Sequence, residues 1–386
     1  MNIASLIALQ ALKLPHKRAV VLARPKSSLR YEYPFYTFAE FERRSSQIAH
    51  KLKREGITPG TRVLLFIRPC LDFSVITFAL FKLGAIPVLI DPGMGKANLL
   101  KAIQEVKPRA MIAENIVHVL RWWYAQSFQT VAMSFTVKGL LRDLSSEKSE
   151  IELFPAQDSD PAAILFTSGG TGTPKGVITT HGILLSQTAM LQEMFALTEK
   201  DIDLPGFPLF ALFTLAMGMT SVVPDMDPTA PASCDPAKIV RTLLDQQVTF
   251  AAGSPAIWER VGRYCEAKKI QLPSLKHVVM FGAPVRGEIH QLFAGILPFG
   301  NTHTPYGATE CLPVTSFDGR TILKETWPLT KKGFGTCVGP AAPGNLITIE
   351  KNAHIPVGFP AGVGEILVQG PTVTKGYFER PVETQA

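Results

Sequence analysis

Cysteine is scarce in this chain, because the 386 residues include five: Cys70, Cys234, Cys265, Cys311 and Cys337. None forms a C-x-x-C pair with another, which disfavours a zinc site and a redox-active pair. A reduced, cytoplasmic protein is the expectation for such cysteine usage. Charged residues are also sparse, at 18%, but 46% of the residues are hydrophobic, which excludes an intrinsically disordered chain.

A clustered basic surface, as nucleic-acid binding requires, is missing as well. The formal net charge is +7, yet the lysines and arginines are spread along the chain. The densest groups, within 17–30 and 51–54, are interpreted as solvated faces. We therefore expect no nucleic-acid partner, and an anionic small substrate suits the charge equally well.

Long hydrophobic runs are few. The segment 206–223 (GFPLFALFTLAMGMTSVV) has 18 residues without a charge and lies between Pro205 and Pro224. Its length would allow a membrane span, but no second such run accompanies it. We expect a buried helix that lines an apolar pocket, with a membrane-anchored protein as the alternative. No Lys or Arg precedes the apolar N-terminal stretch and no cleavage site follows it, so a signal peptide is not expected.

Strand and helix patterns alternate along most of the chain, which predicts an α/β fold with helices on the faces of a mostly parallel sheet. Helices are expected at 37–54, 72–83, 99–106, 256–268 and 286–296, and strands at 62–67, 86–90, 110–113, 162–167, 249–252, 277–281 and 302–306. From about Val314 onward, short runs broken by glycine and proline predict a small antiparallel β unit without helices. The polar, acidic segment 145–160 is expected to connect two α/β units.

The strongest motif runs from Leu165 to Gly176 and reads LFTSGGTGTPKG. It follows an apolar strand and is expected to precede a helix. Its glycines let the backbone curl so that several N–H groups point at one anion, and its hydroxyls and Lys175 add donors and a positive charge. Such a segment is what a polyphosphate needs.

Two other phosphate-binding motifs do not match this segment. A P-loop needs glycine directly before the lysine, where Pro174 stands, and a Rossmann G-x-G-x-x-G begun at Gly170 would need glycine in place of Lys175. A plain flexible turn is the alternative, but it gives no reason for Pro174 and Lys175 at these places.

A second motif, 304–310, reads TPYGATE. An aromatic ring near a strand end can stack on a purine, and the hydroxyl of Thr309 and the carboxylate of Glu310 could meet a phosphate and its Mg²⁺. By itself the pattern is weak, because a buried tyrosine in a turn would look the same. It gains weight from the glycine-rich segment before it.

Together the two motifs resemble those of the adenylate-forming superfamily, which includes acyl-CoA synthetases, luciferases and the adenylation domains of peptide synthetases. Further segments in the same order are similar to motifs of this family: 82–85 (KLGA), 282–284 (GAP), 362–366 (GVGEI) and 376–377 (GY). The resemblance spans essentially the whole chain. It implies two mixed, mostly parallel αβα lobes within 1–313, divided near 150–160, and a small β-barrel-like lobe over 314–386.

The resemblance also implies the cofactors, ATP and Mg²⁺, with CoA left open, and a two-step reaction that begins with acyl-AMP and pyrophosphate. The catalytic residues would be Thr167, Lys175, Thr309 and Glu310, with Glu310 holding Mg²⁺. The residues around ATP would be Thr167, Ser168, Gly169, Gly170, Thr171, Gly172, Lys175, Gly282, Ala283, Pro284, Thr304, Pro305, Tyr306, Gly307 and Thr309, with Tyr306 stacked on adenine.

The acyl pocket implied by the resemblance is apolar, which suits a fatty acid better than an amino acid. Its residues would be Phe207, Phe210, Ala211, Phe213, Gly253, Ser254 and Phe281. Many family members have histidine after the Pro-Leu-Phe element, where this chain has Ala211. The family's ribose-binding Asp and mobile C-terminal domain with its catalytic Lys would lie beyond Ala386, so we expect an N-terminal portion that adenylates poorly without that domain.

Within the family, four segments resemble the branch that forms β-lactones in bacterial long-chain olefin biosynthesis: 208–213, 224–229, 304–306 and 335–339. The implied substrate is a long-chain 3-hydroxy fatty acid. A fatty acyl-CoA ligase, an acyl-AMP ligase and a nucleotide-binding module without turnover remain as alternatives. The cluster Trp122-Trp123-Tyr124 could edge an acyl tunnel or touch a membrane, but core packing is the expectation.

Overall fold

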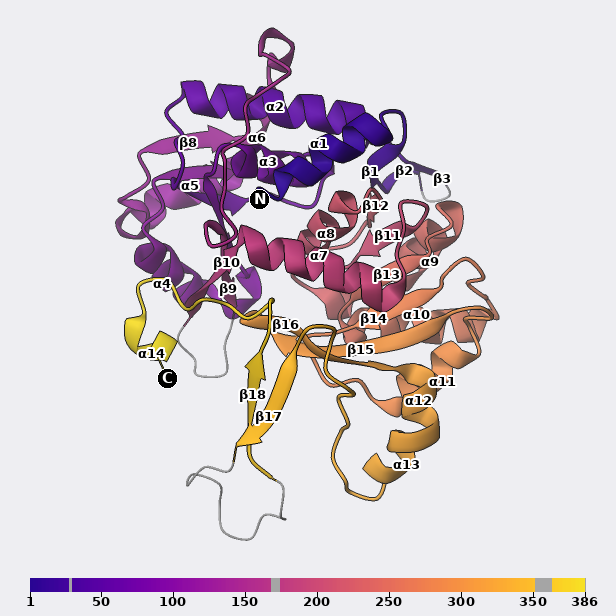
Figure 1. The fold of residues 1–386 in the computed structure, drawn as a ribbon. Coiled ribbons are helices and arrows are strands. Elements are labelled where there is room, and N and C mark those ends of the chain that lie inside the picture. The colour runs from indigo at the N-terminus through magenta and orange to yellow at the C-terminus, as the bar shows by residue number, and fades with distance from the viewer. Residues whose placement is uncertain (28–29, 168–173, 351–362, 386) are drawn as a thin grey trace.

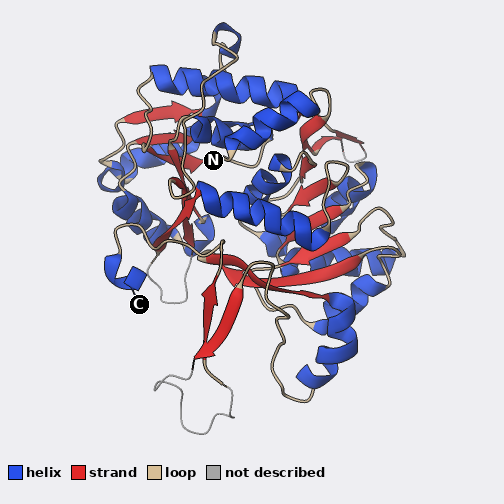
Figure 2. Ribbon diagram, viewed as in Figure 1, coloured by secondary structure: helices blue, strands red, loops and turns tan. Residues whose placement is uncertain are grey.

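The computed structural model describes residues 1–27, 30–167, 174–350 and 363–385. Two large sheets with helices on both faces form the body of the molecule (Figures 1 and 2). The first sheet has six strands in the order β10 (Lys175–Thr180), β9 (Pro161–Thr167), β6 (Ile86–Ile90), β5 (Arg62–Phe66), β7 (Ala110–Ala113) and β8 (Met133–Thr136). All neighbouring pairs in it are parallel except β9–β10.

The second sheet has eight strands in the order β16 (Cys311–Asp318), β15 (Asn301–Ala308), β14 (His277–Met280), β13 (Phe250–Gly253), β11 (Ile202–Pro205), β12 (Thr220–Val223), β1 (Arg18–Leu22) and β4 (Phe35–Thr37). Its edge pairs β15–β16 and β1–β4 are antiparallel and the inner pairs are parallel. The predicted pair of mostly parallel α/β lobes is therefore confirmed. Two small hairpins complete the described sheets: β2 (Arg24–Ser27) with β3 (Arg30–Glu32), and β17 (Leu346–Glu350) with β18 (Glu365–Gln369).

The helices are α1 (Ala4–Lys13), α2 (Phe38–Arg54), α3 (Leu71–Lys82), α4 (Lys96–Val106), α5 (Asn115–Trp123), α6 (Val137–Leu141), α7 (His181–Phe195), α8 (Ala211–Ala216), α9 (Pro236–Asp245), α10 (Pro255–Lys268), α11 (Gly287–Ala294), α12 (Gly319–Thr321), α13 (Trp327–Thr330) and α14 (Pro381–Gln385). The start of α2 is a capping box, because Thr37 Oγ1 accepts a hydrogen bond from Glu40 N–H and Glu40 Oε2 accepts one from Thr37 N–H.

Side-chain alternation along the strands builds a core on each face of the first sheet. On β5, Val63 and Leu65 pack with α2 and α3, while Leu64 packs with α4. The second sheet shows the same pattern on β13. Ala251 belongs to a cluster that contains α9, α10 and α11, and Phe250 to one that contains Phe195 of α7.

The strands before and after the expected division near 150–160 do not separate into the two sheets. Strands β9 and β10 come after that segment and still belong to the six-stranded sheet, whereas β1 and β4 come from the N-terminal part and join the other sheet. The suggested boundary between 313 and 314 falls inside β16.

Two expectations about local structure are wrong. The apolar run 206–223 is not one helix, because a short helical turn η4 (Pro208–Phe210) and α8 are followed by Gly218, with φ +85°, and by strand β12. The region after Val314 is not free of helix, because α12, η6 (Ile322–Thr326) and α13 follow β16. Asp318 starts this stretch by accepting a hydrogen bond from Thr321 N–H at 3.0 Å.

No helix in the described part of the chain has both the length and the apolar character that a bilayer crossing requires. The apolar run 206–223 is accordingly accounted for inside the second α/β lobe.

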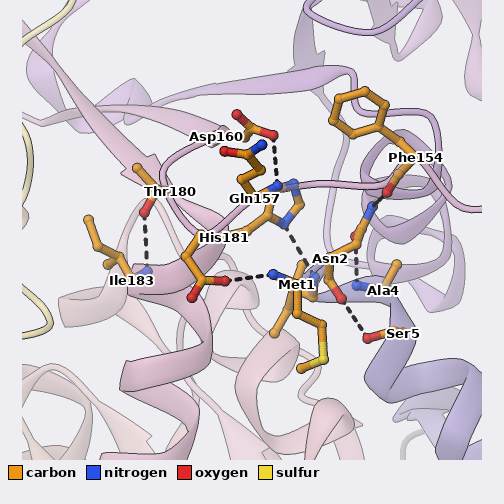
Figure 3. A network of polar contacts seen from close by, with 12 residues as sticks. Met1, Asn2, Ala4, Ser5, Phe154, Gln157, Asp160, Thr180, His181 and Ile183 are labelled. Carbon is orange, nitrogen blue, oxygen red and sulfur yellow. Dashed lines mark hydrogen bonds and ion pairs between the residues drawn. The ribbon is translucent and has the colours of Figure 1, made fainter.

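Asn2 ties the start of the chain to the first lobe (Figure 3). Its side chain is buried, its Nδ2 donates to the carbonyls of Phe81 and Phe154 at 2.8 and 3.1 Å, and its Oδ1 accepts from Ala4 N–H at 2.9 Å. Beside it, Ile3 N–H donates to Nδ1 of the buried His181 at the start of α7. One amide thus connects α1, the end of α3 and the segment before β9.

Replacing Asn2 by alanine should lower the free energy of unfolding by about 1–3 kcal/mol, because the buried Ala4 N–H loses its acceptor. The carbonyls of Phe81 and Phe154 each lose one donor but still accept from Gly84 N–H and Ala156 N–H. Urea unfolding followed by circular dichroism measures the change. Asn115→Ala, at an exposed position on α5, is the control and should change stability by less than about 0.5 kcal/mol. Equal stability of the two variants would contradict a structural role for Asn2.

Candidate active site

The glycine-rich segment connects two antiparallel strands. Thr167 ends β9 and Lys175 begins β10, and the two residues are partners in the β9–β10 register. The expected residues Ser168, Gly169, Gly170, Thr171 and Gly172 lie outside the described residues. The helix expected after this segment is present as α7, which begins at His181, but the six residues of β10 lie between the segment and the helix. No helix N-terminus therefore lies directly after Lys175.

Tyr377 lies between the two motifs found in the sequence. The ammonium group of Lys175 lies over the Tyr377 ring, 5.0 Å from its centroid, and the Tyr377 hydroxyl donates a 2.7 Å hydrogen bond to Glu310 Oε1. Burial, together with this bond to a carboxylate, raises the pKa of Tyr377 to about 12, so the phenol remains a donor at neutral pH. Lys175 and Glu310 are thus brought to one place.

The segment that carries Tyr377 runs antiparallel beside β10. Tyr377 bridges Val177, Phe378 N–H donates to the Gly176 carbonyl at 2.7 Å, and Ile178 N–H donates to the Gly376 carbonyl at 3.1 Å. These contacts join residues about 200 positions apart in the chain. The Gly376-Tyr377 pair belongs to the family resemblance, but nothing in the sequence indicates which residues Tyr377 contacts.

Glu310 and Thr309 form the two-residue connection of the β15–β16 hairpin. The Glu310 carbonyl accepts a 2.7 Å hydrogen bond from Thr374 N–H, which fixes this turn against the segment beside β10. Gly307 lies at the register shift before the turn, where a Cβ would come within 2.5 Å of the Cys311 carbonyl oxygen. Glycine at this position therefore allows the hairpin to close tightly.

Tyr306 lies within β15, opposite Thr315 of β16, and 43% of its surface is exposed. Its neighbours Thr304 and Pro305 are half-buried in the same strand. The exposed ring is available for stacking, but contact with a base stays a prediction.

The loop 282–284 follows β14 directly. Strands β14 and β15 are parallel with Val279 opposite His303, so the chain leaves β14 at the edge of the sheet toward which β15 continues to Tyr306. Gly282 has φ +86° with open space where a Cβ would be, and Ala283 and Pro284 are exposed. The loop and the tyrosine that are both expected to contact adenine thus lie at the same edge of the sheet.

The expected acyl-pocket phenylalanines gather where β11, β13 and β14 end. The rings of Phe210 and Phe281 are in contact, with centroids 4.4 Å apart, and Phe207 and Phe213 lie 6.1 and 6.2 Å from Phe210. The Gly253 carbonyl accepts a 3.2 Å hydrogen bond from Phe281 N–H. Ligands of open parallel sheets bind at this carboxyl edge.

The two other expected pocket residues, Ser254 and Ala211, have different roles in the structure. The Ser254 hydroxyl caps α10 by accepting from Ala256 N–H at 3.3 Å. Ala211, which is buried, lines a hollow of about 20 Å³ between α3, α8 and the end of β12, together with Pro69, Cys70, Phe73, Ser74, Pro205, Gly206, Pro208, Val223, Pro224, Met226 and Pro228. The expected phenylalanines do not line this hollow, which has room for about one water molecule.

A cation at Glu310 would need oxygen ligands from a bound molecule. In the described ranges, no group of three or more His, Cys, Asp and Glu side chains lies close enough together to hold a metal ion. Mg²⁺ is commonly bound by one or two carboxylates together with substrate phosphates. A single carboxylate close to Lys175 fits that arrangement and does not fit a metal held by protein groups alone.

Asp203 is a buried carboxyl group beneath α8 that sequence reasoning did not single out. Its Oδ2 accepts from Thr214 Oγ1 at 2.7 Å and from Ser221 Oγ at 3.4 Å, and its Oδ1 has no partner within the described structure. Burial raises its pKa from 3.8 to about 7, and the two hydroxyl bonds offset only part of that effect. Asp203 is completely buried, and its two hydrogen bonds come from hydroxyl groups of the protein.

The chain belongs to the AMP-binding enzyme family, whose model matches residues 7–378. The predicted resemblance to adenylate-forming enzymes is thereby confirmed.

Among individual relatives, the chain is 39% identical over 369 residues to an olefin beta-lactone synthetase of Xanthomonas campestris pv. campestris. It is 38% identical over 368 residues to an olefin beta-lactone synthetase of Stenotrophomonas maltophilia. Each match covers 90% of this chain and 65% of the relative, so the chain spans about two-thirds of their length. A crystal structure of a long-chain-fatty-acid-CoA ligase from Archaeoglobus fulgidus shares the fold, with a TM-score of 0.82 at 22% identity, over 100% of this chain and 78% of that one.

The titration of Asp203 should appear in the stability of the protein. Between pH about 4 and pH about 7 the unfolded chain loses this proton while the folded protein keeps it, so the free energy of unfolding falls as pH rises, by up to about 4 kcal/mol. Asp203→Asn keeps the shape of the protonated acid and cannot ionise. Its stability, measured by urea unfolding over this pH range, should lack that fall, and identical pH profiles of the two proteins would contradict the assignment.

Proposed function

We propose that this protein activates a long-chain fatty acid, with ATP, as its acyl adenylate. The observation that carries the proposal is the meeting of Lys175 and Glu310 at Tyr377, where the β9–β10 and β15–β16 hairpins come together. A cation and a carboxylate at one point suit a polyphosphate with its counter-ion. Membership of the AMP-binding family supports the same chemistry.

In this proposal the glycine-rich segment, with Thr167 and Lys175, holds the β- and γ-phosphates of ATP. Tyr306 stacks on adenine beside the loop 282–284, and Thr309 contacts the α-phosphate. Glu310 holds Mg²⁺, which when bound would neutralise phosphate charge. CoA is not required for this first half-reaction.

The reaction joins two anions. A carboxylate oxygen of the fatty acid forms a bond to the α-phosphorus of ATP, and the bond from that phosphorus to the bridging oxygen breaks as pyrophosphate leaves. Positive charge held close to the phosphates reduces the repulsion between carboxylate and triphosphate, and the Lys175 ammonium would supply it. The side chains of the protein would thus act mainly by positioning the two reactants and by offsetting their negative charge.

The character of the aromatic group favours a fatty acid over an amino acid. Phe207, Phe210, Phe213 and Phe281 carry no charge, and the buried Asp203 accepts hydrogen bonds from two hydroxyls of the protein. An alkyl chain that enters between Phe210 and Phe281 must separate the two rings, which are in contact. Contacts of the alkyl chain with the two rings and with the other apolar side chains around them can then replace the lost ring–ring contact.

We further propose that a 3-hydroxy acid is the substrate and a β-lactone the product, which the two relatives at 38–39% identity support. The 3-hydroxyl oxygen attacks the acyl carbonyl carbon, the bond to AMP breaks, and the hydroxyl proton is lost. Holding both groups in one bound molecule gives a high effective concentration, which offsets part of the ring strain. The fold neighbour named as a CoA ligase keeps thioester formation as the second candidate.

Exchange of labelled pyrophosphate into ATP, dependent on a long-chain acid, measures the first half-reaction. Glu310→Gln should lower the exchange rate by about 100-fold, because the variant loses the negative charge that would hold the counter-ion of the phosphates. Glu288→Gln, at an exposed position on α11, is the matched control and should leave the rate unchanged. Full exchange by Glu310→Gln would contradict the role assigned to Glu310, and ATP binding without any exchange in the full-length protein would favour a nucleotide-binding module.

The product separates the two candidate second steps. Full-length protein, ATP and a long-chain 3-hydroxy acid should yield AMP and a β-lactone in the absence of CoA, detected by mass spectrometry. The same acid without its hydroxyl should support pyrophosphate exchange but give no lactone. A strict requirement for CoA, with a thioester as the product, would replace the lactone proposal.

A further inference from the structure

Helix α5 shows its apolar side chains to solvent. Its residues Ile116, Val119, Leu120, Trp122 and Trp123 are 55%, 58%, 45%, 89% and 80% exposed. Spacings of three, four and seven residues place Ile116, Val119, Leu120 and Trp123 on one side of the helix, and Trp122 lies at its border. A surface helix normally turns such a stripe inward, so α5 has the opposite orientation.

The opposite side of α5 carries the groups that attach it to the protein. Arg121 donates hydrogen bonds to Ser134 Oγ and to the Val131 carbonyl, and His118 bonds the Phe135 carbonyl at 3.2 Å. Val117 and Tyr124 pack against the core between α4 and the first sheet. These inward contacts fix the orientation of α5, and its apolar stripe faces outward as a result.

The expectation that Trp122 and Trp123 pack in a core is therefore wrong. The segment follows a strand of the first sheet, but α5 lies beside β8, the edge strand of that sheet (Figure 1). Tyr124 alone of the three aromatic residues is half-buried.

We propose that the exposed face of α5 binds the interface of a phospholipid membrane. Tryptophan is enriched where apolar and aqueous phases meet, because its ring is apolar and its N–H is polar. A helix lying in that interface buries an apolar stripe and keeps cations beside it. The stripe of α5, with two tryptophans at its C-terminal end, has this composition.

The charges around α5 favour lipid headgroups over a basic protein surface. The helix contains no Asp or Glu. Lys96 of α4 extends to its end, with the ammonium 3.1 Å from the Tyr124 hydroxyl and 5.2 Å from that ring's centroid. With a net charge of +7, the chain is attracted to an anionic membrane surface. A long-chain acid partitions into the same phase, so the surface would bring the proposed site close to its substrate, although membrane binding itself does not depend on that function.

Co-sedimentation with vesicles of phosphatidylcholine and a minority of phosphatidylglycerol tests the proposal on the full-length protein. Wild-type protein should pellet with the vesicles, and Trp122→Ser/Trp123→Ser should bind at least about tenfold more weakly, because two rings that would enter the interface are removed. Phe299→Ser is the matched control: Phe299 is 80% exposed, as Trp123 is, but lies outside α5, so the variant should bind like wild type. Circular dichroism checks that each variant folds.

Quenching by brominated phospholipid gives a second measurement. Wild-type tryptophan fluorescence should be quenched on binding, and the fluorescence that remains in the double variant, to which Trp258 and Trp327 contribute, should not be. Wild-type protein that stays in the supernatant, or a double variant that pellets equally, would overturn the proposal. Self-association of the wild-type protein that the double variant abolishes, while neither protein binds vesicles, would also overturn the proposal, because a second copy would then be the occupant of this face. Failure of iodide to quench Trp122 and Trp123 in the vesicle-free full-length protein would overturn it too, because another segment would then cover them.

Discussion

A single apolar cluster shared by both sheets is the constraint on which the candidate site depends. Val20 of β1 and Val63 of β5 belong to this cluster although they lie in different sheets, and buried residues of α1, α2, α3 and α8 pack between them. Burial of apolar surface is the main favourable contribution to folding, so the two sheets are held in one relative orientation. In that orientation the β9–β10 hairpin reaches the turn of the β15–β16 hairpin, and the segment before α14 can pair with one and hydrogen-bond the other.

Much of the architecture could be predicted because the relevant forces are local. Strands 86–90 and 110–113 have the expected bounds, and the capping box at Thr37 marks the start of α2, since each depends on neighbouring residues alone. The local rules failed where a short strand or helix is stabilised by distant contacts. Strand β10 exists because it pairs with β9 on one side and with 376–378 on the other, and the helical stretch after Gly319 packs Trp327 against Gly287.

The candidate site divides in the same way. Lys175 and Glu310 stand out in the sequence because their motifs have a chemical rationale and a family resemblance, but their proximity depends on pairings between residues far apart in the chain. Tyr377 belongs to a segment of the family resemblance, 376–377, but that segment does not indicate what its ring and hydroxyl contact, so its contacts with both residues could not be foreseen. The exposure of Trp122 and Trp123 escaped prediction for a related reason: periodicity identifies an apolar stripe, but Arg121 and His118 determine which side of α5 faces the protein.

The Tyr377 ring and hydroxyl have an electrostatic consequence. In the described structure, neither Lys175 nor Glu310 forms an ion pair, because the first lies over the ring and the second accepts from the phenol. A neutral aromatic residue thus contacts both the ammonium and the carboxylate, and the two charged groups do not pair with each other. Both charges remain available to a ligand that carries negative charge on one part and a bound cation on another, and such a ligand need not first break a salt bridge.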